Sequence, residues 1–344
     1  MNLDPDAVQL RLAEATAALA RHDDALPRLA GLGLFRLDLP LDVEGLDLGV
    51  AASVVAGLEL GRAMRPLPGY RETVFAAHLL HAAGATELLA PAGRGEHLIA
   101  TVGLRSSSTV RLDDEGRLHG ESEPLPAAPW KSAVVRARTP NGPALVLVPV
   151  DAAVSAGGSR LSFTATAGTP LPGITDADIE GHGDAAFLRH AAFLLGLADA
   201  ALSLARDHCR RRQQFGRPLI DFQTVSHRLA ALSAEAEGLV LLAHEAAWRH
   251  DTGLPCGPYP AQTLAAAADH ALATTRLAVQ LHGARGIVAG DPPELAYRLA
   301  ATESTRLGTP QALWQLAGLR RLAGQPGRPA ANSASKASGG SRNV

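Results

Sequence analysis

The stretch Arg210-Arg-Arg-Gln-Gln-Phe-Gly-Arg-Pro-Leu-Ile-Asp-Phe-Gln-Thr-Val-Ser-His-Arg-Leu-Ala230 separates two long helical patterns. The run over 185–209 is nearly free of Gly and Pro, and its apolar residues recur every three to four positions, which predicts a long amphipathic helix. Gly216 and Pro218 are expected to end that helix, and a second apolar face then predicts another helix over about residues 222–249. Cations, an aromatic ring and amide side chains therefore meet at a turn between two helices.

A cationic helix end is often only a favourable partner for the helix dipole, but here the pattern is longer. The sequence Arg212-x-Gln-Phe-Gly-x-Pro-Leu-x-x-Phe-Gln resembles the signature of the acyl-CoA dehydrogenases. In that family these positions contact FAD that is bound mainly by a neighbouring subunit, so the resemblance implies FAD as cofactor and Arg212, Phe215 and Gln223 as contacts. The alternatives are a solvated helix-end cation, a core aromatic and a capping amide.

The composition is that of an ordinary globular protein, with 344 residues, 47% hydrophobic content and a formal net charge of −2. This charge predicts no binding to nucleic acid or to an anionic membrane surface. The acidic start of the chain carries no signal-peptide pattern and no segment is expected to span a membrane, so we expect a cytoplasmic protein. Its two cysteines, Cys209 and Cys256, predict neither a disulfide framework nor a metal site.

Residues 1–96 carry helical stripes interrupted by Gly and Pro, which predicts an N-terminal helical domain. The segments 29–40 and 44–49 resemble loops of the family's N-terminal domain, and Glu59-Leu-Gly-Arg-Ala63 resembles the end of one of its helices.

Residues 97–180 change period, with short β-prone runs at 98–102, 133–137 and 144–150, which predicts a small antiparallel domain. The resemblance implies a reduced form of the family's β-barrel domain. The Thr-Glu and Gly-Ser-Asp elements that hold the flavin ring in the family have no counterpart around 103–117. Residues Ser106 to Thr109 could still donate hydroxyl hydrogen bonds, but a plain surface turn is the favoured interpretation.

Residues 181–325 return to helical periodicity, with long segments at 185–213, 222–249, 260–284 and 310–322 and a short one at 292–299. The predicted fold class is therefore α+β, mainly α, with a C-terminal four-helix bundle as in the acyl-CoA dehydrogenases. Residues 326–344 are poor in large apolar side chains and are expected to form a disordered tail.

A second motif, Gln280-Leu-His-Gly-Ala-Arg-Gly286, closes a long Ala-rich helix and resembles the family's Gln-x-x-Gly-Gly-x-Gly. Small residues let the backbone approach the ADP half of FAD closely, so the resemblance implies Gln280, Gly283 and Ala284 as cofactor contacts. Ala284 stands where the family more often has a second glycine.

Dehydrogenation of an acyl thioester needs a carboxylate to remove the α-proton, and the family usually takes it from a Glu before Gly-Thr. Pro292 to Arg298 matches the helix that leads to this position, but the residue at the position itself is Leu307. An alternative base position of the family corresponds to Ala186. The neighbouring Thr309 and Gln311 match positions that contact FAD.

Two nearby carboxylates remain as weak candidates for the base. Asp184 is more simply a helix N-terminal carboxylate, and Glu303 a solvated residue on a helix face. A displaced base is a poor substitute, since a shift of ~1 Å can cost about a hundredfold in rate.

The resemblance thus implies a subunit of a flavin-dependent acyl-CoA dehydrogenase that lacks the base and completes the FAD site of a second, related subunit. The implied substrate is an acyl-CoA or another acyl thioester, and an electron-transfer flavoprotein is a candidate electron acceptor. Two alternatives stay open: a homo-oligomeric enzyme with a relocated base, and a non-enzymatic scaffold built on the bundle.

Overall fold

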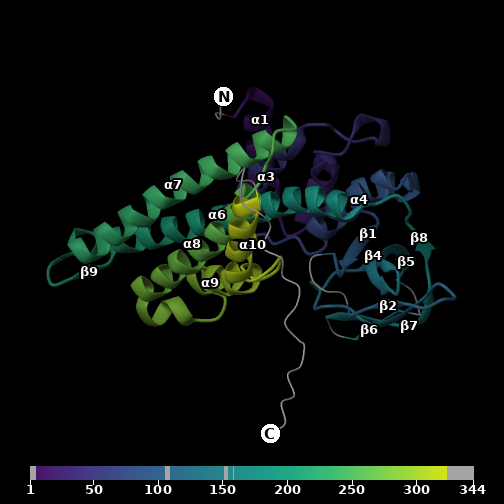
Figure 1. Ribbon diagram of the computed structural model, residues 1–344. Coiled ribbons are helices and arrows are strands. Elements are labelled where there is room, and N and C mark those ends of the chain that lie inside the picture. The colour runs from purple at the N-terminus through teal and green to yellow at the C-terminus, as the bar shows by residue number, and fades with distance from the viewer. Residues whose placement is uncertain (1–4, 105–108, 151–153, 158, 324–344) are drawn as a thin grey trace, which may run out of the picture.

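The computed structural model describes residues 5–104, 109–150, 154–157 and 159–323, so Ser106 to Ser108 and the expected tail at 326–344 lie outside the described residues (Figure 1). The N-terminal part is helical, as α1 (Ala7–Leu19), α2 (Ala25–Leu32), η1 (Leu34–Arg36), η2 (Leu41–Val43), α3 (Gly49–Arg62), α4 (Tyr70–Ala82), η3 (Thr86–Leu88) and α5 (Leu89–Gly93). Local chemistry sets these boundaries. Asp6 and Gln9 form a capping box at the start of α1, and Gly33, with φ of 94°, ends α2.

The middle of the chain forms one sheet from β1 (Leu98–Val102), β2 (Arg111–Leu112), β3 (Arg117–Glu121), β4 (Trp130–Thr139), β5 (Gly142–Pro149), β6 (Val154–Gly157), β7 (Arg160–Ala167) and β8 (Thr169–Pro170). The strand order is β6-β7-β3-β2-β4-β5-β8, with β1 beside β4. The expected purely antiparallel unit is wrong, since β1 and β2 each pair with β4 in parallel. The chain crosses through β2, β3 and the loop over 122–129 before it returns beside β1 in the same direction.

Alternation along the strands decides which side of the sheet is covered by helices. Ile99 and Val134 pack with Phe75 and Leu79 of α4 in one buried cluster. Their neighbours Ala100 and Val135 point the other way, into a second cluster within the β domain. The sheet is therefore attached to the helical part through α4.

The C-terminal half is a helical bundle made by α6 (Asp176–Arg211), α7 (Gln223–Asp251), α8 (Tyr259–His282), α9 (Pro292–Glu303) and α10 (Pro310–Ala323). A small hairpin, β9 (Gln213–Gln214) and β10 (Arg217–Pro218), and the turn η4 (Leu219–Asp221) join α6 to α7, while η5 (Gly283–Ile287) follows α8. Helix α6 begins at Asp176 rather than at 185, because Thr175 and Asp178 form a capping box there.

Helix α6 is the central helix, and its contact with α3 explains two glycines. A Cβ on Gly61 would lie 2.1 Å from the carbonyl oxygen of Phe193, and one on Gly196 would lie 2.0 Å from that of Leu58. Only glycine allows the two backbones to pass this closely. The Glu59 to Ala63 segment therefore serves helix packing.

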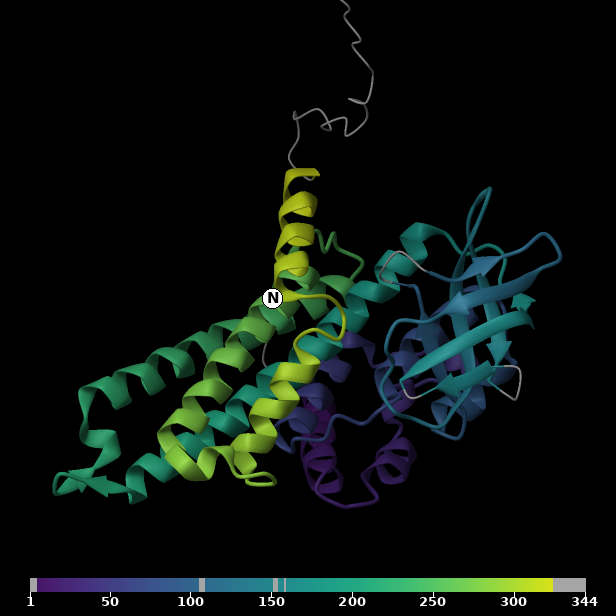
Figure 2. The same ribbon diagram turned by 90° about the horizontal axis from the view of Figure 1, so that it is seen from below.

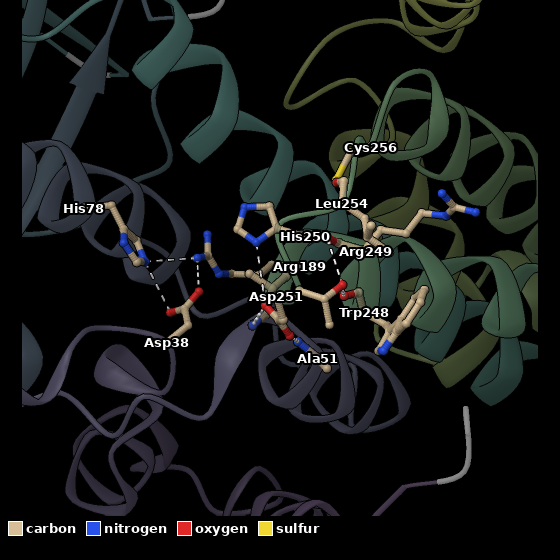
Figure 3. A network of polar contacts seen from close by, with 12 residues as sticks. Asp38, Ala51, His78, Arg189, Trp248, Arg249, His250, Asp251, Leu254 and Cys256 are labelled. Carbon is tan, nitrogen blue, oxygen red and sulfur yellow. Dashed lines mark hydrogen bonds and ion pairs between the residues drawn. The ribbon is translucent and has the colours of Figure 1, made fainter. Parts of the chain in front are cut away.

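A polar network joins the N-terminal helices to the bundle (Figure 3). The carboxylate of Asp251, at the end of α7, accepts hydrogen bonds from the backbone nitrogens of Val50 and Ala51 at 2.7 and 2.9 Å and so caps α3. Beside it, the buried Arg189 of α6 pairs with Asp38. These contacts link segments that are far apart in the sequence.

Helix α6 is also long and apolar enough, by length and composition, to cross a membrane, contrary to the expectation from the sequence. However, 89% of the relevant window is buried inside the molecule. This helix forms the core of the bundle, and α3, α7 and α8 pack around it.

Candidate functional site

A cavity of about 470 Å³ lies where the sheet meets the end of α9, and we call it the junction cavity. Strand β1 contributes Thr101, α4 contributes Glu72, and the loop after β3 contributes Glu123. Leu307, the residue at the family's base position, lines the same cavity. The cavity therefore contains carboxylates, but they come from positions that sequence reasoning did not select.

Glu123 closes part of the junction cavity from within. Its two carboxylate oxygens accept the backbone N–H of Gly103 at 2.9 and 3.2 Å, just after β1 ends. Gly103 begins the segment 103–117, where the flavin-holding elements of the family have no counterpart. The Glu123 carboxylate occupies the backbone N–H of Gly103, so this donor is already used within the chain.

Glu303 is a buried ion-pair residue, so its interpretation as a solvated face residue is wrong. Its carboxylate accepts a hydrogen bond from Arg71 at 2.6 Å and another from Arg306 at 3.1 Å. Burial alone would raise its pKa, but the charges of Arg71, His190 and Arg306 lower the pKa to about 2. A carboxylate held in this way is a weak proton acceptor, and it does not line the junction cavity.

Asp184 is likewise engaged in an ion pair, with Arg320 of α10 at 2.8 Å. Its interpretation as a helix N-terminal carboxylate is wrong, because α6 begins at Asp176 and Asp184 lies inside the helix. It does not line the junction cavity either. Both weak candidates for the base thus hold helices together.

A second cavity, of about 680 Å³, is lined by residues at the end of α6 and after α8, and we call it the bundle-end cavity. The hairpin that follows α6 lies at the end of the bundle away from the sheet (Figures 1 and 2). The cavity brings together Arg212 at the end of α6 with Gly283 and Ala284 after α8, which come from the two separate motifs. The remaining lining residues are His208, Arg211, Gln214, Leu219, Leu281, His282 and Arg285. Among these lining residues there is no carboxylate, so the cavity is strongly cationic.

The residues around this cavity leave space open rather than filling it. Arg212, Gly283 and Ala284 are exposed, and a Cβ on Gly283, whose φ is 61°, would meet no atom within 4 Å. Gln280 accepts a hydrogen bond from Arg228 of α7 at 3.3 Å, next to the cavity. Backbone that is accessible and free of bulky side chains is what close approach by a ligand requires.

The hairpin carries Phe215 at its tip. This side chain is 92% exposed and its φ is 52°, so its interpretation as a core aromatic is wrong. Its ring lies edge-on to that of Phe222, with the centroids 6.3 Å apart, and most of its surface is accessible to a ligand or a partner. Gln223 is the exposed first residue of α7 and does not line the bundle-end cavity.

Thr309 and Gln311 do not join the bundle-end cavity. They lie at the start of α10, where Thr309 Oγ1 accepts the backbone N–H of Ala312 at 3.2 Å and caps the helix. Gly308, directly before them, lines the junction cavity. The eight residues that the resemblance assigned to FAD are therefore divided between two places.

Several functional candidates were missed from the sequence. His208 lies one helical turn before Arg212, so helical spacing would have placed it beside the cation, and Arg285 follows the Gly-Ala pair directly. Glu72 and Glu123 gave no usable signal, since only the packing of α4 and the loop against β1 brings them into the junction cavity.

Comparison with known proteins shows which proteins this chain is similar to. Residues 188–320 match the family profile described as acyl-CoA dehydrogenase, C-terminal domain. An acyl-CoA dehydrogenase of Bacillus subtilis is 37% identical over 119 residues, which is 35% of this chain and 31% of that protein. Acyl-CoA dehydrogenase FadE27 of Mycobacterium tuberculosis is 29% identical over 315 residues, covering 80% of this chain and 82% of that protein.

The fold is also matched by a solved structure. A chain of the ChsE4-ChsE5 complex from Mycobacterium tuberculosis superposes with a TM-score of 0.81 at 24% identity, covering 95% of this chain and all of the other (100%). This likeness extends over the N-terminal helices, the sheet and the bundle together. Residues 188–320 thus match the acyl-CoA dehydrogenase C-terminal domain, and the chain as a whole has the fold of the acyl-CoA dehydrogenases, a family of FAD-dependent oxidoreductases that act on CH–CH groups.

Proposed function

We propose that this chain is the subunit without a catalytic base in a hetero-oligomeric, flavin-dependent acyl-CoA dehydrogenase. The observation that carries the proposal is the contrast between the two cavities. In the junction cavity the residue at the base position is Leu307, and the Gly103 N–H already donates to Glu123. The bundle-end cavity, in contrast, is open and cationic.

The bundle-end cavity fits the diphosphate half of FAD. Arg212 offers a planar, permanently charged fork of donors that suits phosphate oxygens. Gly283 and Ala284 expose backbone without large side chains, and the lining carries no carboxylate that would repel an anion. Arg212, Gly283 and Ala284 would hold the cofactor there, with the exposed Phe215 and Gln223 and the neighbouring Gln280 as further contacts.

The junction cavity does not fit a flavin of the chain's own. Glu72 and Glu123 place two carboxylates in it, and Glu123 already accepts the Gly103 N–H. Inserting a ring with its own acceptor groups would require that hydrogen bond to break without a replacement for the displaced carboxylate. Thr309 and Gln311 stand beside this cavity and are therefore the least supported of the proposed FAD contacts.

In the assembly, FAD bound at the shared site would supply a hydride acceptor for the β-carbon of an acyl-CoA or other acyl thioester. This chain's residues bind and orient the phosphate end, while the related partner subunit supplies the carboxylate that removes the α-proton. Leu307 cannot accept a proton, and Glu303 and Asp184 are held in ion pairs. A partner of another sequence is supported by the solved relative, which is a complex of two differently named proteins, ChsE4 and ChsE5.

The test is to produce the chain alone and together with its partner, for which an acyl-CoA dehydrogenase-like protein encoded beside it is the first choice. We expect the chain alone to purify without flavin and the complex to be yellow and to be bleached by an acyl-CoA. One FAD per chain in the isolated protein, reduced by acyl-CoA, would contradict the proposal. A complex that remains colourless would favour the scaffold.

A relocated base in a homo-oligomeric enzyme is the second candidate, and one observation favours it. Glu72 and Leu307 both line the junction cavity. The cavity therefore contains a carboxylate, although the residue at the family's base position is not one. This places Glu72, rather than Asp184 or Glu303, as the residue to examine. Flavin reduction by the isolated chain that is lost in Glu72→Gln would support this candidate.

A further inference from the structure

Two histidines form part of the bundle-end cavity and have no assigned role. His208 comes from α6 and His282 from the last turn of α8, and their rings lie with centroids 4.2 Å apart and planes at 30°. Both side chains line the cavity beside Arg212 and Gly283. Because the two imidazoles lie close together and near arginines, protonation of either ring is unfavourable in the absence of an anion.

The tautomer of neutral His282 is fixed by its own helix. Its Nδ1 lies 2.7 Å from the carbonyl oxygen of Ala278, and a carbonyl can only accept, so Nδ1 carries the hydrogen and donates it. In the neutral ring the other nitrogen, Nε2, then has a lone pair and no hydrogen. Nε2 can bind an anionic oxygen only after it takes up a proton.

The surroundings disfavour a positive charge on His208 when no ligand is present. From α6 the pair faces Arg211 and Arg212, and from η5 it faces Arg285. The hairpin and η4 contribute only Gln214 and Leu219, which do not titrate, and Asp291 pairs with Arg285 at 3.4 Å. Burial, then the charges of His282, Arg212, Arg211 and Arg285, lower the pKa of His208.

We propose that the His208–His282 pair takes up a proton when a diphosphate binds in the bundle-end cavity, so that cofactor retention by this subunit is linked to pH. The inference rests on the proposed function for the identity of the ligand. A bound diphosphate brings two negative charges into a cavity that has no carboxylate among its lining residues, and these charges oppose the field of the arginines at both rings. The proton then makes Nε2 of His282 a donor to a phosphate oxygen.

The direction of the pH dependence follows from the negative charges that the ligand adds. Binding raises the pKa of the pair, so affinity is highest where the bound form is protonated and falls as pH rises through the pKa of the bound state. A rise of about one unit corresponds to a tenfold change in affinity. We therefore expect binding on the order of tenfold tighter at about pH 6 than at about pH 8.

The probe is ADP-ribose, because its diphosphate is a diester that stays fully ionised over this range and its adenosine diphosphate part matches that of FAD. Isothermal titration of the chain at constant ionic strength gives the affinity at each pH. Repeating the titration at neutral pH in buffers of different ionisation enthalpy gives the number of protons taken up. For the wild-type chain we expect net uptake, up to about one proton.

Three variants separate the inference from its alternatives. His208→Gln/His282→Gln should bind ADP-ribose with an affinity that no longer changes between the two pH values and with no proton uptake. His227→Gln, an exposed histidine of α7 outside the cavity, should behave as wild type. Arg212→Gln should weaken binding at both pH values while keeping the pH dependence.

Unchanged proton uptake in the double histidine variant would overturn the inference, and so would wild-type binding that is equal at both pH values. Failure of the wild-type chain to bind ADP-ribose at the lower pH would overturn it as well. None of these results decides the proposed function, which is judged by the flavin content and the acyl-CoA bleaching of the complex. Circular dichroism of each variant confirms that the helices remain intact.

Discussion

The junction cavity and the bundle-end cavity differ in how their charged and polar groups are paired. In the junction cavity, Glu123 accepts the Gly103 N–H. Glu303, which follows the lining residue Thr302 in the chain, is paired with Arg71 and Arg306. At the bundle end, Arg212 and the exposed backbone at Gly283 have no carboxylate among the lining residues. In the junction cavity Glu123 already accepts the Gly103 N–H, whereas the bundle-end cavity has an excess of positive charge that an anionic ligand would balance. The difference indicates which half of a shared cofactor site this subunit provides.

The largest expected effect tests how firmly the side of the junction cavity is held together. Glu303→Gln removes a buried charge and leaves Arg71 with a neutral partner at a position that is 8% exposed. Breaking such a pair costs about 3–5 kcal/mol, because the remaining charge stays buried. Urea unfolding followed by circular dichroism measures it. Glu294→Gln, in the first turn of the same helix, is the control, because Glu294 pairs with the exposed Arg298. Equal losses in the two variants would mean that the Glu303 pair contributes no more than a contact with an exposed arginine.

Acid should abolish the same contribution in the wild-type chain. The pKa of Glu303 is about 2 in the folded protein and 4.5 ordinarily, so the stabilisation is present above about pH 4.5 and is lost as pH falls toward about 2. The difference in unfolding free energy between wild type and Glu303→Gln should therefore shrink between about pH 5 and about pH 3. A constant difference over this range would show that the charge of Glu303 is not what stabilises the fold.

The next effect concerns the open half. Arg212→Gln in the assembled complex should weaken FAD binding about 10- to 100-fold, since a charge-assisted contact is worth roughly 1.5–3 kcal/mol. The flavin-to-protein ratio after gel filtration, followed by titration with FAD, gives the change. Arg210→Gln is the control, because Arg210 pairs with Asp207 and does not line the cavity. If both variants lose flavin to the same degree, the effect reflects general charge and not the site.

The smallest expected effect is at the junction cavity's own carboxylates. Glu72→Gln and Glu123→Gln should each leave the turnover of the complex within about twofold, because no step of the proposed chemistry uses them. Steady-state rates with an acyl-CoA and an artificial electron acceptor measure this. A loss of about a hundredfold or more in Glu72→Gln would instead identify it as a relocated base.

Sequence reasoning predicted long helices well and charged residues poorly. The bundle helices were found because their apolar periodicity extends over many turns, although α6 begins earlier than expected since the capping pair Thr175 and Asp178 was overlooked. The sequence indicates a solvated Glu303, because nothing within its own helix shows that Arg71 of α4 lies against it. Parallel pairing of β1 with β4 was missed for the same reason, since strand direction depends on how the chain crosses.

The candidate site divides along the same line. Arg212, Gly283 and Ala284 could be named in advance, because their motifs are local and the turns that carry them are set by nearby Gly and Pro residues. The sequence could not predict that these residues meet in one cavity, that the rings of His208 and His282 lie against each other, or that Thr309 lies apart from this group.

The sequence by itself determined the family signature, the helical and β-rich segments and the absence of a carboxylate at Leu307, since these depend on residue identity and spacing along the chain. Only the tertiary structure decided that Asp184 and Glu303 are held in ion pairs, that Glu123 covers a backbone donor and that the bundle end remains open and cationic. Burial and charge pairing depend on neighbours that are close in space and distant in sequence, and those neighbours are fixed only when the helices and the sheet pack together.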